Sequence, residues 1–226
     1  MSKKITDMKY RLAIFDLDGT LLDTLDDLTD ATNVALRENG YPIHTKKEIC
    51  AFVGDGIKKL IERAVPLHAG QQDIARVFAA FVAYYTAHCA DKTAPYEGII
   101  PLLHALRAAG VKTAVLSNKA DHATKALCNL YFAGLFDVVV GERESEGIPK
   151  KPAPDGVFAI MRECGTAACD TVYIGDSEVD LVTAKNAGTH VISVAWGFRS
   201  VELLRENGAK VFADTPRELE ALILNM

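Results

Sequence analysis

The sequence of 226 residues has few cysteines, a single tryptophan, no long apolar run and no surplus of positive charge. Its five cysteines are scattered without close pairing, which is typical of reduced thiols in a cytosolic protein and leaves no CxxC metal or redox motif. No apolar run reaches the length of a bilayer-spanning helix, and the polar start, MSKKITDMKY, is unlike a signal peptide. We therefore expect a cytoplasmic protein without a membrane segment.

The charge balance excludes further classes of partner. A net charge of -5 at pH 7 argues against a general affinity for nucleic acid or for an anionic membrane. It does not exclude an anionic substrate, because local charges set the affinity of a site. The histidines show no metal-ligand spacing, and there is no internal repeat or low-complexity segment. What is present, 49% hydrophobic and 24% charged residues, is typical of a globular protein that buries a sizeable core.

One stretch near the start, RLAIFDLDGTLLDT at residues 11–24, joins a short apolar run to two acids. An apolar run without alternation indicates a strand buried on both faces of a parallel sheet. Asp16 and Asp18 follow this strand, and in open α/β sheets ligands bind beyond the carboxyl ends of the strands. Two carboxylates at that place repel each other unless a cation or a proton lies between them. Taken alone, the stretch also fits a strand followed by an ordinary acidic turn.

A helical block follows this strand. Helices are predicted from apolar spacing over residues 24–39, 45–53, 57–65 and 71–90. Thr45-Lys46-Lys47-Glu48 is a capping-box pattern, and Asp23 and Thr24 are expected to cap the first helix. Because no strand is predicted within this block, we predict a second, all-helical domain over residues 23–95.

From residue 99 onward, helices and strands alternate. Helices are predicted over residues 99–109, 120–130, 155–164, 178–187 and from 215 towards 224, and strands over residues 112–116, 136–140, 171–174, 190–194 and 210–213. Such alternation indicates a doubly wound parallel sheet with right-handed crossovers. We therefore predict an α/β fold with a Rossmann-like core of residues 1–22 and 96–226, interrupted after its first strand by the helical domain.

Polar clusters follow four of the predicted strands. They are Asp16 with Asp18, Ser117-Asn118-Lys119, Lys150-Lys151 and Gly175-Asp176 with Asp180. The carboxyl ends of parallel strands meet at one edge of a sheet, so we expect these side chains to lie together. An acidic, oxygen-rich pocket suits Mg²⁺, and an aspartate can attack phosphorus to form an aspartyl-phosphate. The inventory therefore fits phosphoryl transfer, with a lysine as the fixed cation.

These clusters, in this order, resemble the motifs of the haloacid dehalogenase-like phosphatase superfamily. The likeness rests on DLDGT at 16–20, SN at 117–118, KPAPD at 151–155 and GDSEVD at 175–180, and it spans the chain from Lys9 onward. A helical insertion after the first motif resembles the C1-type cap of that family. FVGDGIKKL at 52–60 and LLDTLDDL at 21–28 are similar to segments of its phosphoglycolate phosphatases.

The resemblance implies a role for each acid. Asp16 would be the nucleophile and a Mg²⁺ ligand. Asp18 would be the general acid and then the base, with its backbone carbonyl also on the metal. Asp176 would be the third protein ligand of Mg²⁺. Asp180 would hold a metal-bound water or Lys151, or would bind the metal directly, although it could equally favour the start of its own helix through the dipole.

The resemblance also implies a phosphate-binding set. Ser117 would hold the phosphoryl group with the help of Gly19, Thr20 and Asn118, and Lys151 would neutralise its charge. Ser117 and Asn118 also fit an ordinary helix cap. Lys151 is chosen over Lys150 because it directly precedes a proline, as in the family pattern.

The cap contains one candidate for substrate specificity. Residues 53–58 form either a plain turn at two glycines or a loop that selects the substrate, and Lys58 is its candidate substrate contact. A solvated lysine on a helix is the simpler interpretation.

The resemblance predicts a Mg²⁺-dependent phosphatase acting on a small phosphorylated metabolite, with 2-phosphoglycolate first. Asp18 disfavours dehalogenases and phosphonatases, which lack that acid, and Leu28 stands where sugar phosphomutases carry a cap histidine. A pyrophosphatase or a broad sugar or nucleotide phosphatase is the alternative. A silent binding or regulatory module is remote, because nucleophile, acid and lysine are all present. The sequence leaves a monomer or a homodimer open.

Overall fold

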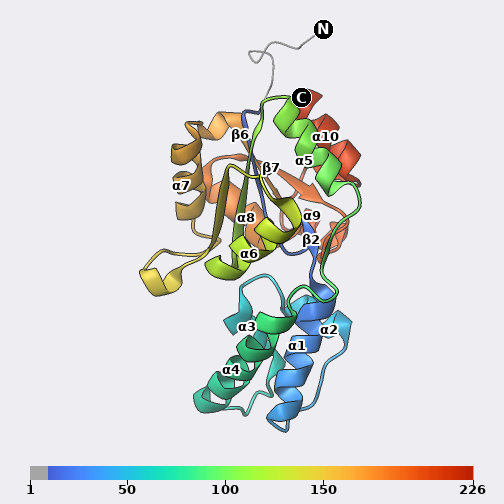
Figure 1. The fold of residues 1–226 in the computed structure, drawn as a ribbon, viewed down its shortest axis with the longest axis vertical. Coiled ribbons are helices and arrows are strands. Elements are labelled where there is room, and N and C mark those ends of the chain that lie inside the picture. Colours follow the sequence, from blue (N-terminus) through green and yellow to red (C-terminus); the bar gives the residue numbers. More distant parts are fainter. Residues whose placement is uncertain (1–9, 226) are drawn as a thin grey trace. The chain divides into compact units, whose positions relative to one another are not determined.

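The computed structural model describes residues 10–225, so the polar segment at residues 1–9, with its signal-peptide prediction, lies outside the described residues. The chain forms two compact units (Figure 1). One unit comprises the chain up to Leu21 and from Pro95 onward, and the other is Leu22–Ala94. Each unit buries its own set of apolar side chains.

A six-stranded sheet forms the centre of the larger unit. Its strands are β1 (Leu12–Phe15), β4 (Lys112–Ala120), β5 (Val138–Glu142), β6 (Thr171–Gly175), β7 (His190–Val194) and β8 (Phe212–Ala213). Their spatial order is β5-β4-β1-β6-β7-β8, and every pair is parallel. All four residues of β1 are fully buried, as expected for a central strand covered on both faces. The predicted doubly wound parallel sheet is confirmed.

Helices connect these strands and cover both faces of the sheet. They are α5 (Ile99–Ala108), α6 (Asp121–Phe132), α7 (Asp155–Cys164), α8 (Glu178–Ala187), α9 (Val201–Glu206) and α10 (Pro216–Asn225), with short 3-10 turns η2 (Glu144–Glu146) and η3 (Ala168–Asp170). α5 packs against α10, and α7 packs against α8 across the sheet from them (Figure 1). The strand order reverses at β1, so the loops after β1, β4 and β6 meet at a topological switch point.

Four predicted strands have different bounds in the structure: β6 ends one residue later than predicted and β8 begins two residues later, and β4 and β5 also differ. β4 runs to Ala120 instead of ending at Leu116, so residues 117–119 lie within the strand, where its register with β5 shifts. β5 begins at Val138, two residues later than predicted. α9 and the pairing of β2 (Leu22–Asp23) with β3 (Ala94–Pro95) are not indicated by the sequence, because segments this short show no periodicity.

Four helices make up most of the smaller unit: α1 (Leu25–Glu38), α2 (Lys46–Phe52), α3 (Ile57–Ala64) and α4 (Gln71–His88). The capping box of Thr45 and Glu48 is present as predicted. Asp23 accepts a hydrogen bond from the Leu25 amide at 3.2 Å. The capping role predicted for Thr24 is wrong: its backbone (φ -106, ψ 1) is not extended, as a side-chain cap requires, and its buried hydroxyl has no hydrogen-bond partner.

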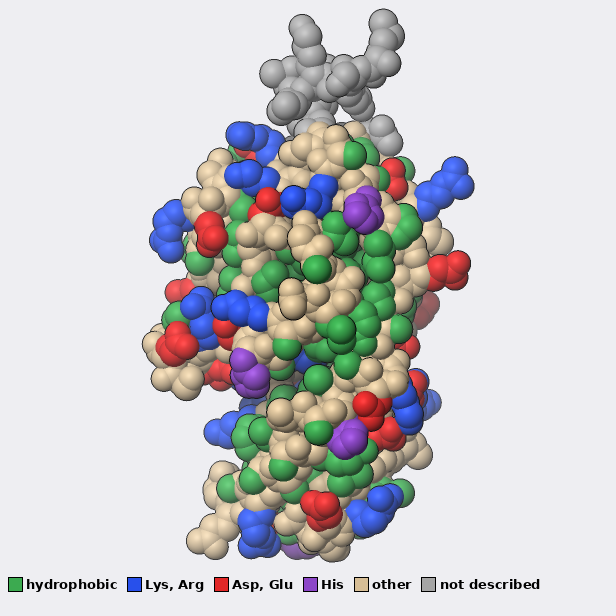
Figure 2. Space-filling model, viewed as in Figure 1, with side chains coloured by type: hydrophobic (Ala, Val, Ile, Leu, Met, Phe, Trp, Pro, Cys, Tyr) green, Lys and Arg blue, Asp and Glu red, His purple; other side chains and the backbone are tan. Residues whose placement is uncertain are grey.

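No helix within residues 10–225 is long and apolar enough to cross a bilayer. On the face shown in Figure 2, acidic and basic side chains are interspersed, without a broad region of one sign. This face therefore offers no extended basic surface of the kind that binds nucleic-acid phosphates.

Candidate active site

The first motif forms a tight turn directly after the central strand. Asp16 follows β1 and is 8% exposed, while Leu17 points back into the core and is fully buried. Gly19 has φ 84 and approaches Asp176 so closely that an added Cβ would lie 2.3 Å from a carboxylate oxygen. Only glycine satisfies both conditions, because it has no Cβ and adopts positive φ cheaply. Gly19 thus allows the turn after β1 to pack against the loop after β6, which carries Asp176.

Lys151 lies at the centre of the site. Its Nζ is 2.9 Å from Asp16 Oδ1 and 2.8 Å from Asp180 Oδ1, and its side chain is 2% exposed. The Asn118 side-chain amide donates to the Lys151 carbonyl at 3.1 Å, which anchors the lysine's loop to β4. Lys150 instead pairs with Glu144 on η2, at 3.0 Å. The structure therefore brings Lys151, and not Lys150, to the acids.

Three buried acids lie close together around Lys151, and two of them pair with it. Carboxylate oxygens of Asp16, Asp176 and Asp180 lie within 4.8 Å of one another. Among the residues that the structure describes, Lys151 alone forms an ion pair with any of them. Three ionised carboxylates and one ammonium would leave an excess of two negative charges in a buried place, which a divalent cation with a preference for oxygen ligands would balance. The residues present therefore fit Mg²⁺.

Burial and crowding change the pKa values of these groups. Burial and the neighbouring Asp180 raise the pKa of Asp176 to about 7, against the opposing hydrogen bond from the Phe198 amide. Burial also raises the pKa of Asp16 well above its ordinary value, and Lys151 only partly offsets this. Burial alone would lower the pKa of Lys151, but Asp16 and Asp180 raise it well above its ordinary value. The ammonium therefore stays charged.

Without metal, the protein is expected to lose stability as the pH rises from about 4 to 7. Folded Asp176 keeps its proton up to a pKa of about 7, whereas the unfolded side chain releases it near 3.8. The folded state then binds more protons in this window, so the free energy of unfolding falls with rising pH. The complete shift corresponds to about 4 kcal/mol. Mg²⁺ should restore this stability.

Thermal unfolding in EDTA and in Mg²⁺, at pH 5 and pH 8, measures this effect. The rise in unfolding temperature caused by Mg²⁺ should be larger at pH 8, because at pH 5 the metal must compete with protons. Asp176→Asn, which cannot ionise, should lose most of both the pH dependence and the Mg²⁺ effect. An equal Mg²⁺ effect at the two pH values would contradict the charge excess described above.

Asp18 has a partner that the sequence did not reveal. The Lys119 ammonium lies 2.9 Å from both carboxylate oxygens of Asp18, and its side chain is 2% exposed. Ser117 is also buried, and its hydroxyl accepts from the Lys119 amide at 3.2 Å. Side chains two residues apart on a strand point to the same face of the sheet. The spacing of Ser117 and Lys119 could therefore have indicated that Lys119 lies on the same side as Ser117. The two acids of the first motif thus have different lysines, Asp16 with Lys151 and Asp18 with Lys119.

Asp180 and Thr20 each hold a neighbour in place. Asp180 Oδ2 accepts from the Ser177 hydroxyl at 2.6 Å and from its amide at 3.1 Å, while Oδ1 faces Lys151. Asp180 is therefore both the N3 residue of the capping box at Ser177, which begins α8, and the partner of the lysine. The Thr20 hydroxyl donates to Asp176 Oδ1 at 3.2 Å. Lys58 is an exposed residue in the first turn of α3, in the smaller unit.

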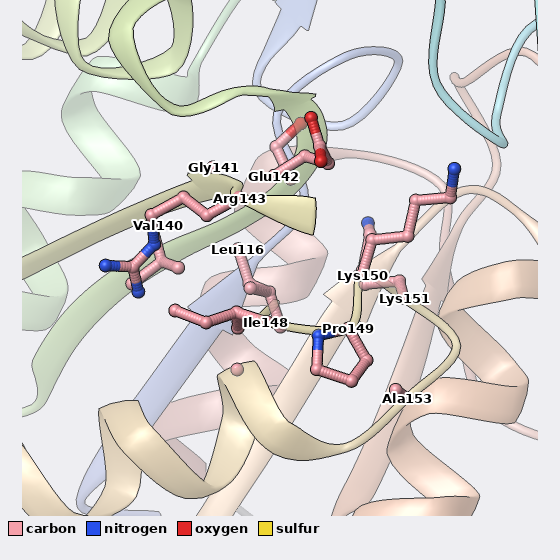
Figure 3. Close-up of a pocket in the computed structure, with 12 residues that line it drawn as sticks. Leu116, Val140, Gly141, Glu142, Arg143, Ile148, Pro149, Lys150, Lys151 and Ala153 are labelled. Carbon is pink, nitrogen blue, oxygen red and sulfur yellow. The ribbon is translucent and has the colours of Figure 1, made fainter. Parts of the chain in front are cut away.

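A pocket adjoins Ser117 and Lys151 (Figure 3). Its lining combines apolar side chains with polar or charged ones: Leu116, Val140, Ile148, Pro149 and Ala153 are apolar, and Ser117, Glu142, Arg143, Lys150 and Lys151 are polar or charged. Lys150 and Lys151 stand at one side, and the Arg143 side chain runs away from them (Figure 3). The pocket therefore places both apolar and charged side chains beside Lys151.

Comparison with known families decides what this arrangement is. Residues 13–194 match the model of the haloacid dehalogenase-like hydrolase family. The chain belongs to this family. The predicted superfamily is confirmed, and with it the assignment of the chain as an enzyme, a phosphatase of the haloacid dehalogenase-like type.

Relatives of this hydrolase are similar to it along nearly their whole length. A phosphoglycolate phosphatase of Caulobacter vibrioides is 31% identical, over 96% of this chain and 94% of the relative. A crystal structure from Lactobacillus delbrueckii subsp. bulgaricus, provisionally named a phosphoglycolate phosphatase, is 39% identical with a TM-score of 0.92, over 97% of this chain and 100% of the other. CbbY of Rhodobacter sphaeroides, solved as a variant in complex with xylulose-1,5-bisphosphate, is 26% identical with a TM-score of 0.70, over 93% and 96%.

Proposed function

We propose that this hydrolase is a Mg²⁺-dependent phosphatase that cleaves a small phosphomonoester through an aspartyl-phosphate on Asp16, with 2-phosphoglycolate as the first candidate substrate. One observation carries the chemistry: Asp16, next to the buried ammonium of Lys151, lies among three acids at the carboxyl edge of the sheet. The similarity to phosphoglycolate phosphatases supports the substrate.

The proposed reaction has two steps. In the first, an Asp16 carboxylate oxygen bonds to phosphorus, the ester P–O bond breaks, and the leaving oxygen takes a proton from Asp18. In the second, Asp18 removes a proton from water, the water oxygen bonds to phosphorus, and the bond between phosphorus and Asp16 breaks. Phosphate leaves, Asp16 is again a carboxylate, and Asp18 is again protonated. Lys119 orients the Asp18 carboxylate between these two tasks.

The remaining residues would bind and neutralise the phosphoryl group. The Ser117 hydroxyl and the backbone amides near Gly19 and Asn118 would bind the phosphoryl oxygens. Lys151 would offset the negative charge of the phosphoryl group beside the Asp16 carboxylate. Mg²⁺ would be held by the carboxylates of Asp16 and Asp176 and by the Asp18 backbone carbonyl. Asp180 would lie outside these ligands, where it pairs with Lys151. When bound, Mg²⁺ would supply positive charge to the phosphoryl oxygens.

Several finer assignments belong to the same proposal. Lys58 would contact the substrate from the cap, and the core and cap would be the domains of residues 1–22 with 96–226 and of residues 23–95. A cytoplasmic location is favoured by the cysteines, which form no disulfide bond among the described residues. A monomer and a homodimer both fit a site whose proposed residues come from one chain.

A panel of phosphate esters tests the substrate. With saturating Mg²⁺, we expect kcat/KM for 2-phosphoglycolate to exceed that for pyrophosphate, hexose phosphates and nucleotides by at least about tenfold, a margin that a few added polar contacts supply. A higher kcat/KM for another ester would contradict 2-phosphoglycolate as the substrate and favour that ester instead. Absence of Mg²⁺-dependent hydrolysis of every ester, including a chromogenic one, would favour the silent binding module instead.

A further inference from the structure

The loop that follows β7, residues 195–199, touches the site although it lies outside the four motifs. We propose that this loop positions Asp176 for the divalent cation, and that Gly197 and Trp196 are its positioning residues. The inference deepens the proposed function and rests on it, because it concerns the same metal site.

Asp176 is held from two sides. The Phe198 backbone amide donates to Asp176 Oδ2 at 2.7 Å, and the Thr20 hydroxyl donates to Oδ1 at 3.2 Å. The carboxylate is 2% exposed, so both donors act where water does not compete. Each oxygen has more than one acceptor direction, so these bonds orient the carboxylate and leave it able to bind a cation.

Gly197 permits this approach by having no side chain. A Cβ at this position would lie 2.2 Å from the Cβ of Asp176 and 2.6 Å from its carboxylate oxygen Oδ2. The backbone of Gly197 does not adopt positive φ, so an alanine would not be strained for that reason. The requirement for glycine is therefore one of space alone. Any larger residue must displace either the loop or Asp176.

Trp196 ties the same loop to the turn that follows the nucleophile. Its indole Nε1 donates to the Thr20 carbonyl at 3.1 Å, and the Thr20 hydroxyl is itself a donor to Asp176. On the other side of the loop, Arg199 Nε donates to Glu178 Oε2 at the start of α8, at 3.1 Å. The loop thus links the turn at Thr20, the carboxylate of Asp176 and the first turn of α8.

Two variants of the full chain test the proposal through Mg²⁺ affinity. Gly197→Ala should weaken Mg²⁺ binding about 10- to 100-fold in isothermal titration calorimetry, the usual effect of losing an outer contact to a metal ligand. Trp196→Phe keeps an aromatic ring but removes the N–H donor together with part of the indole, and it should weaken binding severalfold. In both variants, raising the Mg²⁺ concentration should recover most of kcat. A purely structural role would lower the unfolding temperature in EDTA without changing the Mg²⁺ Kd.

Gly70→Ala is the matched control. Gly70 also has ordinary backbone angles (φ -80, ψ 172), and an added Cβ there meets only a carboxylate oxygen at 3.7 Å, a normal contact. Its Mg²⁺ affinity should equal that of the wild type. If Gly197→Ala does not fold, the Mg²⁺ Kd of Trp196→Phe tests the proposal by itself.

The outcomes separate this proposal from the one on which it rests. If the wild type binds Mg²⁺ and the folded loop variants bind it equally well, the loop has no positioning role and the proposed function stands. If the wild type binds no Mg²⁺ and hydrolyses no phosphate ester, both proposals fail together.

Discussion

Asp16→Asn should lower kcat by at least about 10⁴-fold, because the amide cannot attack phosphorus. The carboxylate is well placed for this attack: Oδ1 accepts from the Leu17 amide at 2.7 Å and lies 2.9 Å from Lys151 Nζ. Asparagine has nearly the same shape and can keep the Leu17 contact. The variant therefore removes the reacting atom while disturbing little of the packing around it.

The same substitution should leave stability unchanged or raise it in the absence of metal. Burial and the carboxylates of Asp180 and Asp176 raise the pKa of Asp16, so the charged form is disfavoured in the folded state. A neutral side chain avoids that cost. Loss of turnover together with an equal or higher unfolding temperature would show a chemical role, since misfolding would lower both.

Steady-state kinetics on a chromogenic phosphate ester, with thermal unfolding in EDTA, provide the measurement. Asp137→Asn is the matched control. Asp137 directly precedes β5, at the amino-terminal ends of the strands and away from the site, and it pairs with Arg107. That variant should retain kcat within about twofold. Normal Mg²⁺-dependent hydrolysis by Asp16→Asn would rule out Asp16 as the nucleophile.

Lys151→Met is expected to have the second largest effect, on activity and on stability alike. Methionine approximates the lysine's length but leaves Asp16 and Asp180 without their shared cation. Breaking a buried ion pair by removing one partner costs about 3–5 kcal/mol at neutral pH. The loss of a fixed positive charge beside Asp16, the proposed nucleophile, should also lower kcat/KM by about 10³-fold or more.

The stability loss should depend on pH. Lys151 lowers the folded-state pKa of Asp16, so its removal raises that pKa further, and the variant loses stability relative to the wild type once the pH exceeds the folded-state pKa of Asp16 in the wild type. At pH 5 the buried carboxylates can take up protons, and the gap in unfolding free energy to the wild type should be smaller than at pH 8. Urea unfolding of both proteins in EDTA at the two pH values measures this gap.

Lys150→Met provides a stringent control because it changes the neighbouring residue. Lys150 pairs with Glu144, whose side chain is 52% exposed, and exposed pairs of this kind contribute at most about 1 kcal/mol. Its kcat/KM should stay within a few fold of the wild type. If Lys150→Met proved as damaging as Lys151→Met, the assignment of the central cation to Lys151 would be wrong.

The elements that position the site follow from local sequence signals. Buried parallel strands are short apolar runs, and their helices carry recognisable starts and stops, such as the capping box of Ser177 and Asp180 at the start of α8 and Gly188 after its end. The end of β4 does not follow from such signals. Ser117, Asn118 and Lys119 are polar, yet pairing with β5 resumes at Ala120, so the strand extends through residues that resemble a loop.

Polar clusters after the strands were visible in the amino-acid pattern. Asp16, Asp176, Asp180 and the pair Lys150-Lys151 could be singled out because the carboxyl ends of parallel strands must meet at one edge, and the family resemblance selected Lys151 from that pair. Tertiary structure alone decided which of these groups touch. It paired Asp18 with Lys119, gave Lys151 to both Asp16 and Asp180, and brought the Phe198 amide to Asp176. Nearly every residue has a backbone amide, so the sequence cannot indicate which amide contacts Asp176. The distances between side chains on different strands depend on how segments far apart in the sequence pack together.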